Sequence, residues 1–285
     1  MTGRTLVLTA LAMLAFAGNS LLCRLALKNA AIDPATFTCA RLVSGALALW
    51  CISRALAGGE AKGGNWASAL ALFAYAAAFS FAYVSLSAGT GALLLFGAVQ
   101  ATMILTGLVR GERLQARQGA GLVIAIAGLV FLLLPGIAAP PPLGAALMVI
   151  AGIAWGIYSL RGRGAGNPLA VTAGNFARTI ALAAPLGALC FAGMHWDARG
   201  MAFAVASGAL TSGVGYAIWY SALRGLKATS AASVQLSVPI ITAAGGVSLL
   251  GESIGLRLVV ASVAVLGGIA LVIAGPRRPD GRNGG

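Results

Sequence analysis

The sequence predicts an all-α membrane protein of ten transmembrane helices, arranged as two inverted five-helix repeats. Three observations lead to this fold class. Hydrophobic residues fill 59% of the 285 positions and charged residues only 9%, so the charged surface of a soluble domain is missing. Apolar runs of about 20 residues, the length that crosses a bilayer, follow one another with short connections. The second half of the chain also repeats features of the first half.

The apolar runs are separated by ordinary turn and breaker residues, such as the Asp33 to Pro34 step and the proline-rich segment 135–142. The first run has no clear small-residue cleavage site and similar runs follow it, so we interpret it as a retained helix rather than a signal peptide. The expected spans are 5–27, 34–56, 66–86, 88–110, 116–134, 142–160, 169–191, 199–220, 230–250 and 256–274.

The basic residues indicate the orientation of these spans. Thirteen of the 19 basic residues fall in segments on the same side as the N-terminus, against three in the loops of the other side, Lys28, Arg199 and Arg257. By the positive-inside rule both termini are cytoplasmic, in a multi-pass protein of a bacterial-type inner (plasma) membrane. The net charge of +13 is spread over many loops rather than gathered on one face, so no nucleic-acid partner is expected.

An internal repeat divides the chain. Residues 89–133 align without a gap onto residues 229–273 at an offset of 140, which pairs Gly111 and Glu112 with Gly251 and Glu252, and Gly128 with Gly268. Five spans in a half is an odd number, so the second half enters the membrane from the opposite side. Inverted repeats of this kind are typical of transporters. The expected domains are a first repeat at 1–137, a second at 138–275 and a disordered cytoplasmic tail at 276–285.

Transporters built from two repeats usually bind substrate near the bilayer midplane, between the repeats. Aromatic and polar side chains at spacings of three or four share a helix face there and can hold an apolar group and its polar end. Amide side chains inside a span also need a polar partner or a substrate. The expected substrate-binding residues are Phe16, Asn19, Ser20, Phe79, Tyr83, Gln100, Trp155, Tyr158, Tyr216, Trp219 and Gln235.

Three arginines, Arg24, Arg41 and Arg178, fall within or near spans, where each either binds a substrate carboxylate or extends toward the interface. The six acidic residues lie in loops, at span ends or in the tail, so no midplane carboxylate offers a proton relay. This distribution favours facilitated or exchange transport, with water chains, His195 or the span-end glutamates as the remaining routes for proton coupling.

The sequence contains few residues that could carry out catalysis or bind a metal. The four cysteines show no C-x-x-C spacing and there is a single histidine, so we expect no catalytic residues, no metal site and no cofactor. An intramembrane enzyme is therefore disfavoured. The expected partners are a small-molecule substrate and the lipid bilayer, with the protein acting as a monomer.

The ten spans, the inverted halves and the Gly-Glu pair before a glycine-spaced last span resemble the drug/metabolite transporter superfamily with its paired EamA-type repeats. More narrowly, the run GNSLLCRLAL at 18–27, with residues 32–34 and 40–42, is similar to bacterial aromatic amino acid exporters. The resemblance implies efflux of aromatic and other neutral amino acids by alternating access through a central cavity. The alternative is a broad-specificity drug or metabolite exporter coupled to protons, which would respond to a pH gradient.

Overall fold

A computed structural model of the protein describes residues 3–57, 63–111, 113–136, 139–162, 167–226 and 228–274. The predicted tail at 276–285 lies outside these ranges. So do Glu60, Glu112 and six of the basic residues assigned to the cytoplasmic side, Lys62, Arg163, Lys227, Arg277, Arg278 and Arg282.

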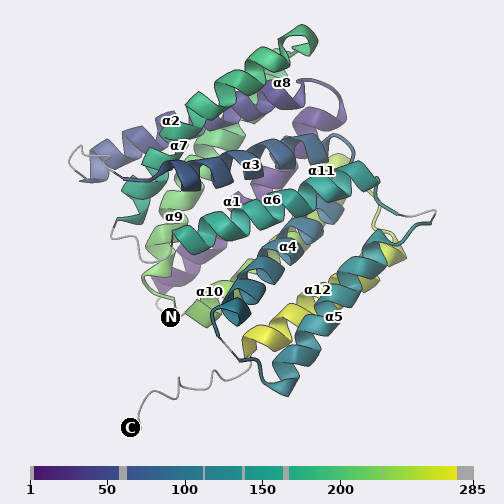
Figure 1. The fold of residues 1–285 in the computed structure, drawn as a ribbon. Coiled ribbons are helices and arrows are strands. Elements are labelled where there is room, and N and C mark those ends of the chain that lie inside the picture. Colours follow the sequence, from purple (N-terminus) through teal and green to yellow (C-terminus); the bar gives the residue numbers. More distant parts are fainter. Residues whose placement is uncertain are drawn as a thin grey trace.

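The regular elements of the described ranges are helices, which form one bundle (Figure 1). They are α1 (Gly3–Lys28), α2 (Pro34–Ala57), α3 (Trp66–Tyr83), α4 (Ala88–Val109), α5 (Ala116–Leu133), α6 (Pro142–Arg161), α7 (Pro168–Leu189), η1 (Phe191–Gly193), α8 (Ala198–Ala206), η2 (Ser207–Val214), α9 (Gly215–Leu223), α10 (Ala228–Gln235), α11 (Ser237–Leu250) and α12 (Leu256–Ala274). Ten helical segments in these ranges are long and apolar enough to cross a membrane, and each overlaps one expected span. The prediction of an all-helical membrane protein with ten spans is confirmed.

The eighth span is not a continuous α-helix. Its middle segment, η2, is π-helical, a form that is frequent at functional sites. The hydroxyls of Thr211 and Ser212 both donate to the carbonyl of Ser207, at 2.6 and 3.0 Å. Gly208 lies so close to α2 that an added Cβ would meet the Arg41 carbonyl oxygen and the Ser44 hydroxyl. The missing side chain of Gly208 therefore lets this helix approach α2.

The ninth span is also interrupted, at Leu236 between α10 and α11. Pro239 follows three residues later and has no N–H to donate to the carbonyl of Gln235. The Gln235 side chain instead donates to the Ala231 carbonyl at 3.3 Å.

The α5 and α12 helices lie side by side at one edge of the bundle (Figure 1). The two glycines that the repeat aligns both lie in this contact. A Cβ on Gly128 would come within 2.7 Å of the Ala264 Cβ. One on Gly268 would meet the Gly121 carbonyl oxygen and come within 2.7 Å of the Ala125 nitrogen. Close backbone approach between small residues is the usual basis of helix packing in membranes.

The outer faces of the helices are apolar and exposed, as a lipid-facing surface requires. Val109, Leu143 and Val263 are 89, 73 and 70% exposed. The interior contains large buried aromatic rings, among them Phe37, Phe79, Tyr83 and Phe176.

At the end of the bundle where α1 stops, the loops after α1 and before α8 are tied together. The Asp33 N–H donates to the His195 carbonyl at 3.0 Å, and the His195 N–H donates to the Asp33 carboxylate at 3.1 Å. The same carboxylate accepts the Thr36 N–H at 2.8 Å at the start of α2. Burial by itself would raise the pKa of Asp33, but the hydrogen bonds from Thr36 and His195 lower it below its ordinary value.

Candidate functional site

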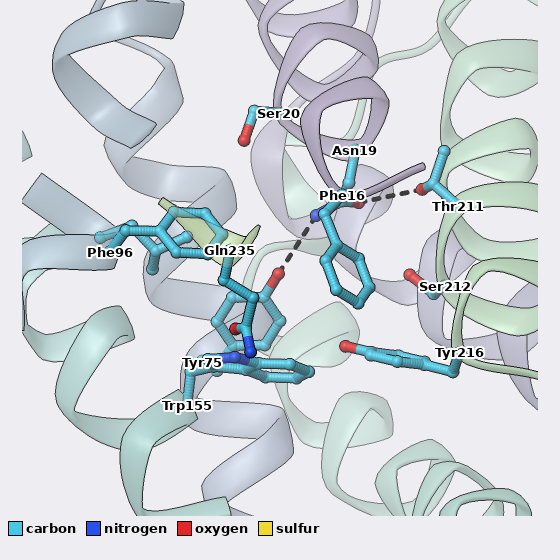
Figure 2. Close-up of a pocket in the computed structure, with 11 residues that line it drawn as sticks. Phe16, Asn19, Ser20, Tyr75, Phe96, Trp155, Thr211, Ser212, Tyr216 and Gln235 are labelled. Carbon is cyan, nitrogen blue, oxygen red and sulfur yellow. Dashed lines mark hydrogen bonds between the residues drawn. The ribbon is translucent and has the colours of Figure 1, made fainter. Parts of the chain in front are cut away.

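A small cavity lies in the middle of the bundle (Figure 2). The space between and around its lining side chains amounts to about 430 Å³, open solvent included. The part that the centre of a water molecule can reach is only about 30 Å³. Side chains therefore crowd the space, and they must move apart to admit a solute. The lining residues are Phe16, Asn19, Ser20, Tyr75, Leu95, Phe96, Trp155, Thr211, Ser212, Tyr216 and Gln235.

These residues come from helices of both halves of the chain. The first half supplies side chains from α1, α3 and α4, and the second half from α6, η2, α9 and α10. Most of them lie well inside their spans, as Tyr75 does in α3 and Trp155 in α6. The cavity is thus enclosed by both halves, away from the helix ends.

Aromatic rings form one side of the cavity. The Trp155 ring is stacked on Tyr216 with centroids 5.4 Å apart, and its centroid is 4.8 Å from that of Tyr75. The Phe16 ring lies 5.9 Å from Tyr216 and, in Figure 2, points toward the space between Trp155 and Tyr216. Rings arranged in this way can enclose an apolar or aromatic group.

A hydrogen-bond network centred on Asn19 forms another side. The Asn19 carbonyl oxygen accepts from the Ser207 hydroxyl at 2.8 Å. The Thr211 hydroxyl, whose shorter bond goes to the Ser207 carbonyl, lies 3.3 Å from the same oxygen. Its amide nitrogen donates to the Tyr75 hydroxyl at 3.1 Å, as Figure 2 shows. With the oxygen bonded to Ser207, the amide nitrogen faces Tyr75.

Six of the eleven predicted substrate-binding residues line the cavity: Phe16, Asn19, Ser20, Trp155, Tyr216 and Gln235. Three more lie one layer behind the lining. Phe79 packs on Tyr75, Trp219 on Phe16 and Tyr158 on Trp155, with centroids 5.4, 5.8 and 5.4 Å apart. They support the lining rings rather than face the cavity.

The remaining two predicted residues lie away from the lining. Tyr83 is fully buried near the end of α3, and its hydroxyl donates to the Ala88 carbonyl at 3.3 Å. Gln100 is buried on α4, one turn beyond Phe96. Neither belongs to the cavity in this structure.

The sequence reasoning missed five lining residues, Tyr75, Leu95, Phe96, Thr211 and Ser212. One available signal was the spacing of four between Tyr75, Phe79 and Tyr83, which puts the three rings on one face of α3. Another was the group of small polar residues in the eighth span, where serine and threonine are unusually dense for a membrane helix.

The three arginines near the spans have different surroundings. Arg24 pairs with Glu252, with 3.0 Å between Nε and Oε1. Arg178 donates from one nitrogen to the carbonyls of Gly63 and Gly174, each at 2.8 Å. Arg41 is 2% exposed, and its one hydrogen bond goes to the Tyr75 hydroxyl, so it does not extend to the interface.

No group of three or more His, Cys, Asp or Glu side chains able to hold a metal ion occurs among the residues that the structure describes. All four cysteines are free. The lining is therefore suited to binding a molecule by packing and hydrogen bonds.

Ten membrane spans around a central cavity define a polytopic membrane protein of the transporter class. The chain belongs to the EamA-like transporter family, whose model matches it twice, at residues 3–134 and 142–274. The protein is accordingly a transporter and not an enzyme. The resemblance to the drug/metabolite transporter superfamily is confirmed at the level of this family.

Relatives and a solved structure match nearly the whole chain. An uncharacterized protein of Pseudomonas aeruginosa is 60% identical over 95% of both chains. An uncharacterized transporter of Archaeoglobus fulgidus is 27% identical over 96% of this chain and 99% of its own. One crystal structure superposes with a TM-score of 0.69 at 20% identity, covering 95% of this chain and 98% of the other. That similarity concerns the fold alone.

Proposed function

We propose that this transporter exports neutral amino acids, aromatic ones included, through the central cavity by alternating access. The observation that carries the proposal is the lining itself, in which aromatic rings and polar groups from both halves meet in the middle of the bundle. The rings of Phe16, Trp155 and Tyr216 suit an apolar or aromatic side chain. The polar groups of Asn19 and Tyr75 suit the charged end of an amino acid.

The organisation of the chain supports alternating access. Each matched segment contains five of the ten spans, so we propose two repeats, at 1–137 and 138–275, of opposite orientation in the membrane. Such repeats can rock against each other and expose a central site first on one side and then on the other.

Polar contacts join the two halves at both ends of the bundle. At the end where α1 stops, Lys28 donates to the Leu250 carbonyl at 2.7 Å, in addition to the pair of Arg24 with Glu252. At the other end, Arg161 donates to the Asn65 side-chain oxygen and the Ser68 hydroxyl, each at 3.1 Å. We infer that passage of a solute breaks one set of contacts at a time.

The orientation and energy source follow from the charges. We propose that both termini are cytoplasmic in a bacterial inner membrane and that the protein acts as a monomer, so the contacts of Arg24 close the outer side. None of the lining residues is acidic. A proton-driven cycle would need a titratable group elsewhere, so we favour facilitated or exchange transport.

The purified full chain, reconstituted in liposomes, tests this proposal through the flux of labelled phenylalanine and leucine, with and without an imposed pH gradient. We expect saturable flux without a gradient and its loss in Trp155→Ala, which removes a cavity ring. Trp66→Ala is the matched control, because Trp66 is 59% exposed at the start of α3. Flux of neither amino acid under any gradient would reject the proposal. Gradient-dependent flux of unrelated cations or drugs would instead support the broad exporter.

A further inference from the structure

Among the residues that the structure describes, one buried cation has no counter-ion. Arg41 is 2% exposed in the first half of α2, and an arginine side chain stays charged in any protein environment. The ion pair found among the described residues joins Arg24 to Glu252 and leaves Arg41 out. A buried charge is ordinarily paired, because its transfer out of water is strongly unfavourable.

The guanidinium of Arg41 is also incompletely hydrogen-bonded. One terminal nitrogen, Nη2, donates to the Tyr75 hydroxyl at 3.0 Å. The guanidinium carbon lies 5.2 and 5.0 Å from the ring centroids of Tyr75 and Phe79, which attract a cation. The remaining nitrogens, Nε and Nη1, are buried without a partner. Unmet donors destabilise a fold, so packing alone is a poor reason for an arginine here.

Tyr75 connects this charge to the cavity. Its hydroxyl oxygen accepts from Arg41 and from Asn19, at 3.0 and 3.1 Å. A phenol oxygen has two lone pairs, and these two bonds use both. The hydroxyl hydrogen of Tyr75 therefore stays available for donation to another acceptor. Both Tyr75 and Asn19 line the cavity. This wall therefore offers an O–H donor to the cavity, with an uncompensated positive charge directly behind it.

We propose that the wall formed by Tyr75, Asn19 and Arg41 binds the carboxylate of the transported solute. The carboxylate accepts from the Tyr75 hydroxyl, and its negative charge compensates Arg41. Arg41 carries one positive charge and therefore matches one negative charge, which favours a carboxylate over a doubly charged phosphate ester. This inference rests on the proposed amino acid transport and deepens it, because it makes the carboxylate the group without which a solute is rejected.

The test compares three ligands of similar shape on the purified full chain in detergent. Phenylalanine carries both charged groups, phenylalaninamide lacks the carboxylate, and 3-phenylpropionate lacks the amine. Each is titrated against the thermal unfolding transition, since a ligand of the folded state raises it. We expect both acids to bind at least tenfold more tightly than the amide. Arg41→Gln abolishes that preference, a loss of about tenfold to a hundredfold for a charge-assisted hydrogen bond.

Arg54→Gln is the matched control. Arg54 belongs to the same helix and also lies over an aromatic ring, with its guanidinium carbon 4.4 Å from the Trp50 centroid, but it is exposed. The Arg54→Gln variant should leave the preference for acids intact. Arg41→Lys keeps the positive charge but lacks the planar guanidinium group, so it should retain part of the preference for acids. If Arg41→Gln fails to fold, Tyr75→Phe keeps the ring, removes the hydroxyl and should weaken acid binding several-fold.

The outcomes separate this inference from the proposed function. An amide that binds as tightly as phenylalanine, or an Arg41→Gln variant that keeps the preference for acids, overturns the inference and leaves amino acid transport standing. Arg41-dependent binding of 3-phenylpropionate or acetate without any response to phenylalanine rejects amino acid transport and supports the carboxylate-binding wall. A wild-type protein that binds none of these anions overturns the inference as well.

Discussion

Arg24 on α1 and Glu252, which follows α11, form an ion pair of 3.0 Å although 228 positions separate them in the chain. Arg24 also donates to the carbonyls of Tyr83 and Val84, at 2.9 and 3.0 Å. The second oxygen of Glu252 accepts the N–H of Ala88 at the start of α4, at 2.8 Å. One partly buried pair thus joins α1, the α3–α4 connection and the α11–α12 connection at one end of the bundle.

Replacing Glu252 by glutamine should lower stability. The change removes the charge opposite Arg24, whose side chain is 13% exposed, but retains an oxygen for the Ala88 N–H. Breaking a buried pair is costly, yet Arg24 keeps its two carbonyl acceptors, so we expect a loss of about 2 kcal/mol. In a chain of this size that lowers the midpoint of thermal unfolding by roughly 4–8 °C, measured at a fixed scan rate in detergent.

Arg199→Gln serves as the control for this pair, because Arg199 is an exposed arginine at the same end that lies over the Phe203 ring. It should change the midpoint by no more than about 1 °C, as exposed arginines contribute little. Equal midpoints for Glu252→Gln and wild type would contradict a role for the pair in holding the three segments together.

The ten spans could be predicted from the sequence because the length of an apolar run is a local property. The π-helical segment η2 could not, because hydropathy does not report contacts between helices such as the close approach of Gly208 to Arg41 and Ser44. Likewise the break after α10 is three residues from Pro239, where the sequence indicated only that a kink was permitted. Contacts between distant segments decide where a long apolar helix deviates.

Two neighbouring glycines on α12 should respond oppositely to alanine. At Gly268 the added Cβ would meet the backbone of α5 at Gly121 and Ala125, whereas at Gly267 nothing lies within 4 Å. Gly268→Ala should therefore destabilise the contact of α5 with α12 by about 1–3 kcal/mol. Gly267→Ala should be neutral or stabilising by up to about 1 kcal/mol, since alanine favours a helix.

Thermal unfolding of the two purified variants, compared with wild type in one detergent, provides the measurement. A midpoint for Gly268→Ala at or above that of Gly267→Ala would show that α5 and α12 are not packed backbone to backbone at this position.

Asn19→Asp should weaken solute binding while preserving the fold. An aspartate has the same shape and still accepts from the Ser207 hydroxyl, so we expect stability within about 1 kcal/mol of wild type. The second aspartate oxygen replaces the amide nitrogen 3.1 Å from the Tyr75 hydroxyl and can accept a hydrogen bond from that hydroxyl. The new carboxylate would then occupy the place proposed for the carboxylate of the solute.

We expect the affinity for phenylalanine to fall at least tenfold in Asn19→Asp, measured by the ligand-induced shift of the unfolding midpoint. Ser248→Asp, an exposed change on α11, should leave the affinity unaltered. Unchanged binding in Asn19→Asp would place the solute elsewhere.

The candidate site could be predicted only in part because the helices around it are apolar on every side. Spacing placed Phe79 and Tyr83 on one face of α3, but Tyr75 shares that face, and the position of the cavity along the helix decides that Tyr75 is the ring that meets it. Similarly, the π-helical turn of η2 shifts the face of the eighth span, so that Thr211 and Ser212 join Tyr216 at the cavity while Trp219 lies behind Phe16. Hydropathy carries no information about such rotations.

The last prediction concerns Asp33, whose pKa is lowered by hydrogen bonds from Thr36 and His195 that outweigh its burial. The pKa of this carboxyl is lower in the folded state than in the unfolded chain. At pH values between the two pKa values, the unfolded chain therefore binds more protons than the folded state. The stabilisation is therefore complete above the ordinary aspartate pKa, about 3.9, and is lost as the pH falls below it. Asp33→Asn, which cannot ionise, should be less stable than wild type at pH 7 by about 1–2 kcal/mol. The difference between the thermal unfolding midpoints of wild type and Asp33→Asn should narrow between about pH 5 and pH 3.

Asp197→Asn is the control, since the Asp197 side chain caps α8 through Gly200 of its own helix and does not join two loops. This variant retains Asp33, so its stability should still fall between about pH 5 and pH 3 as that of wild type does. A constant difference between wild type and Asp33→Asn across this interval would show that the carboxylate of Asp33 does not stabilise the contact between the two loops.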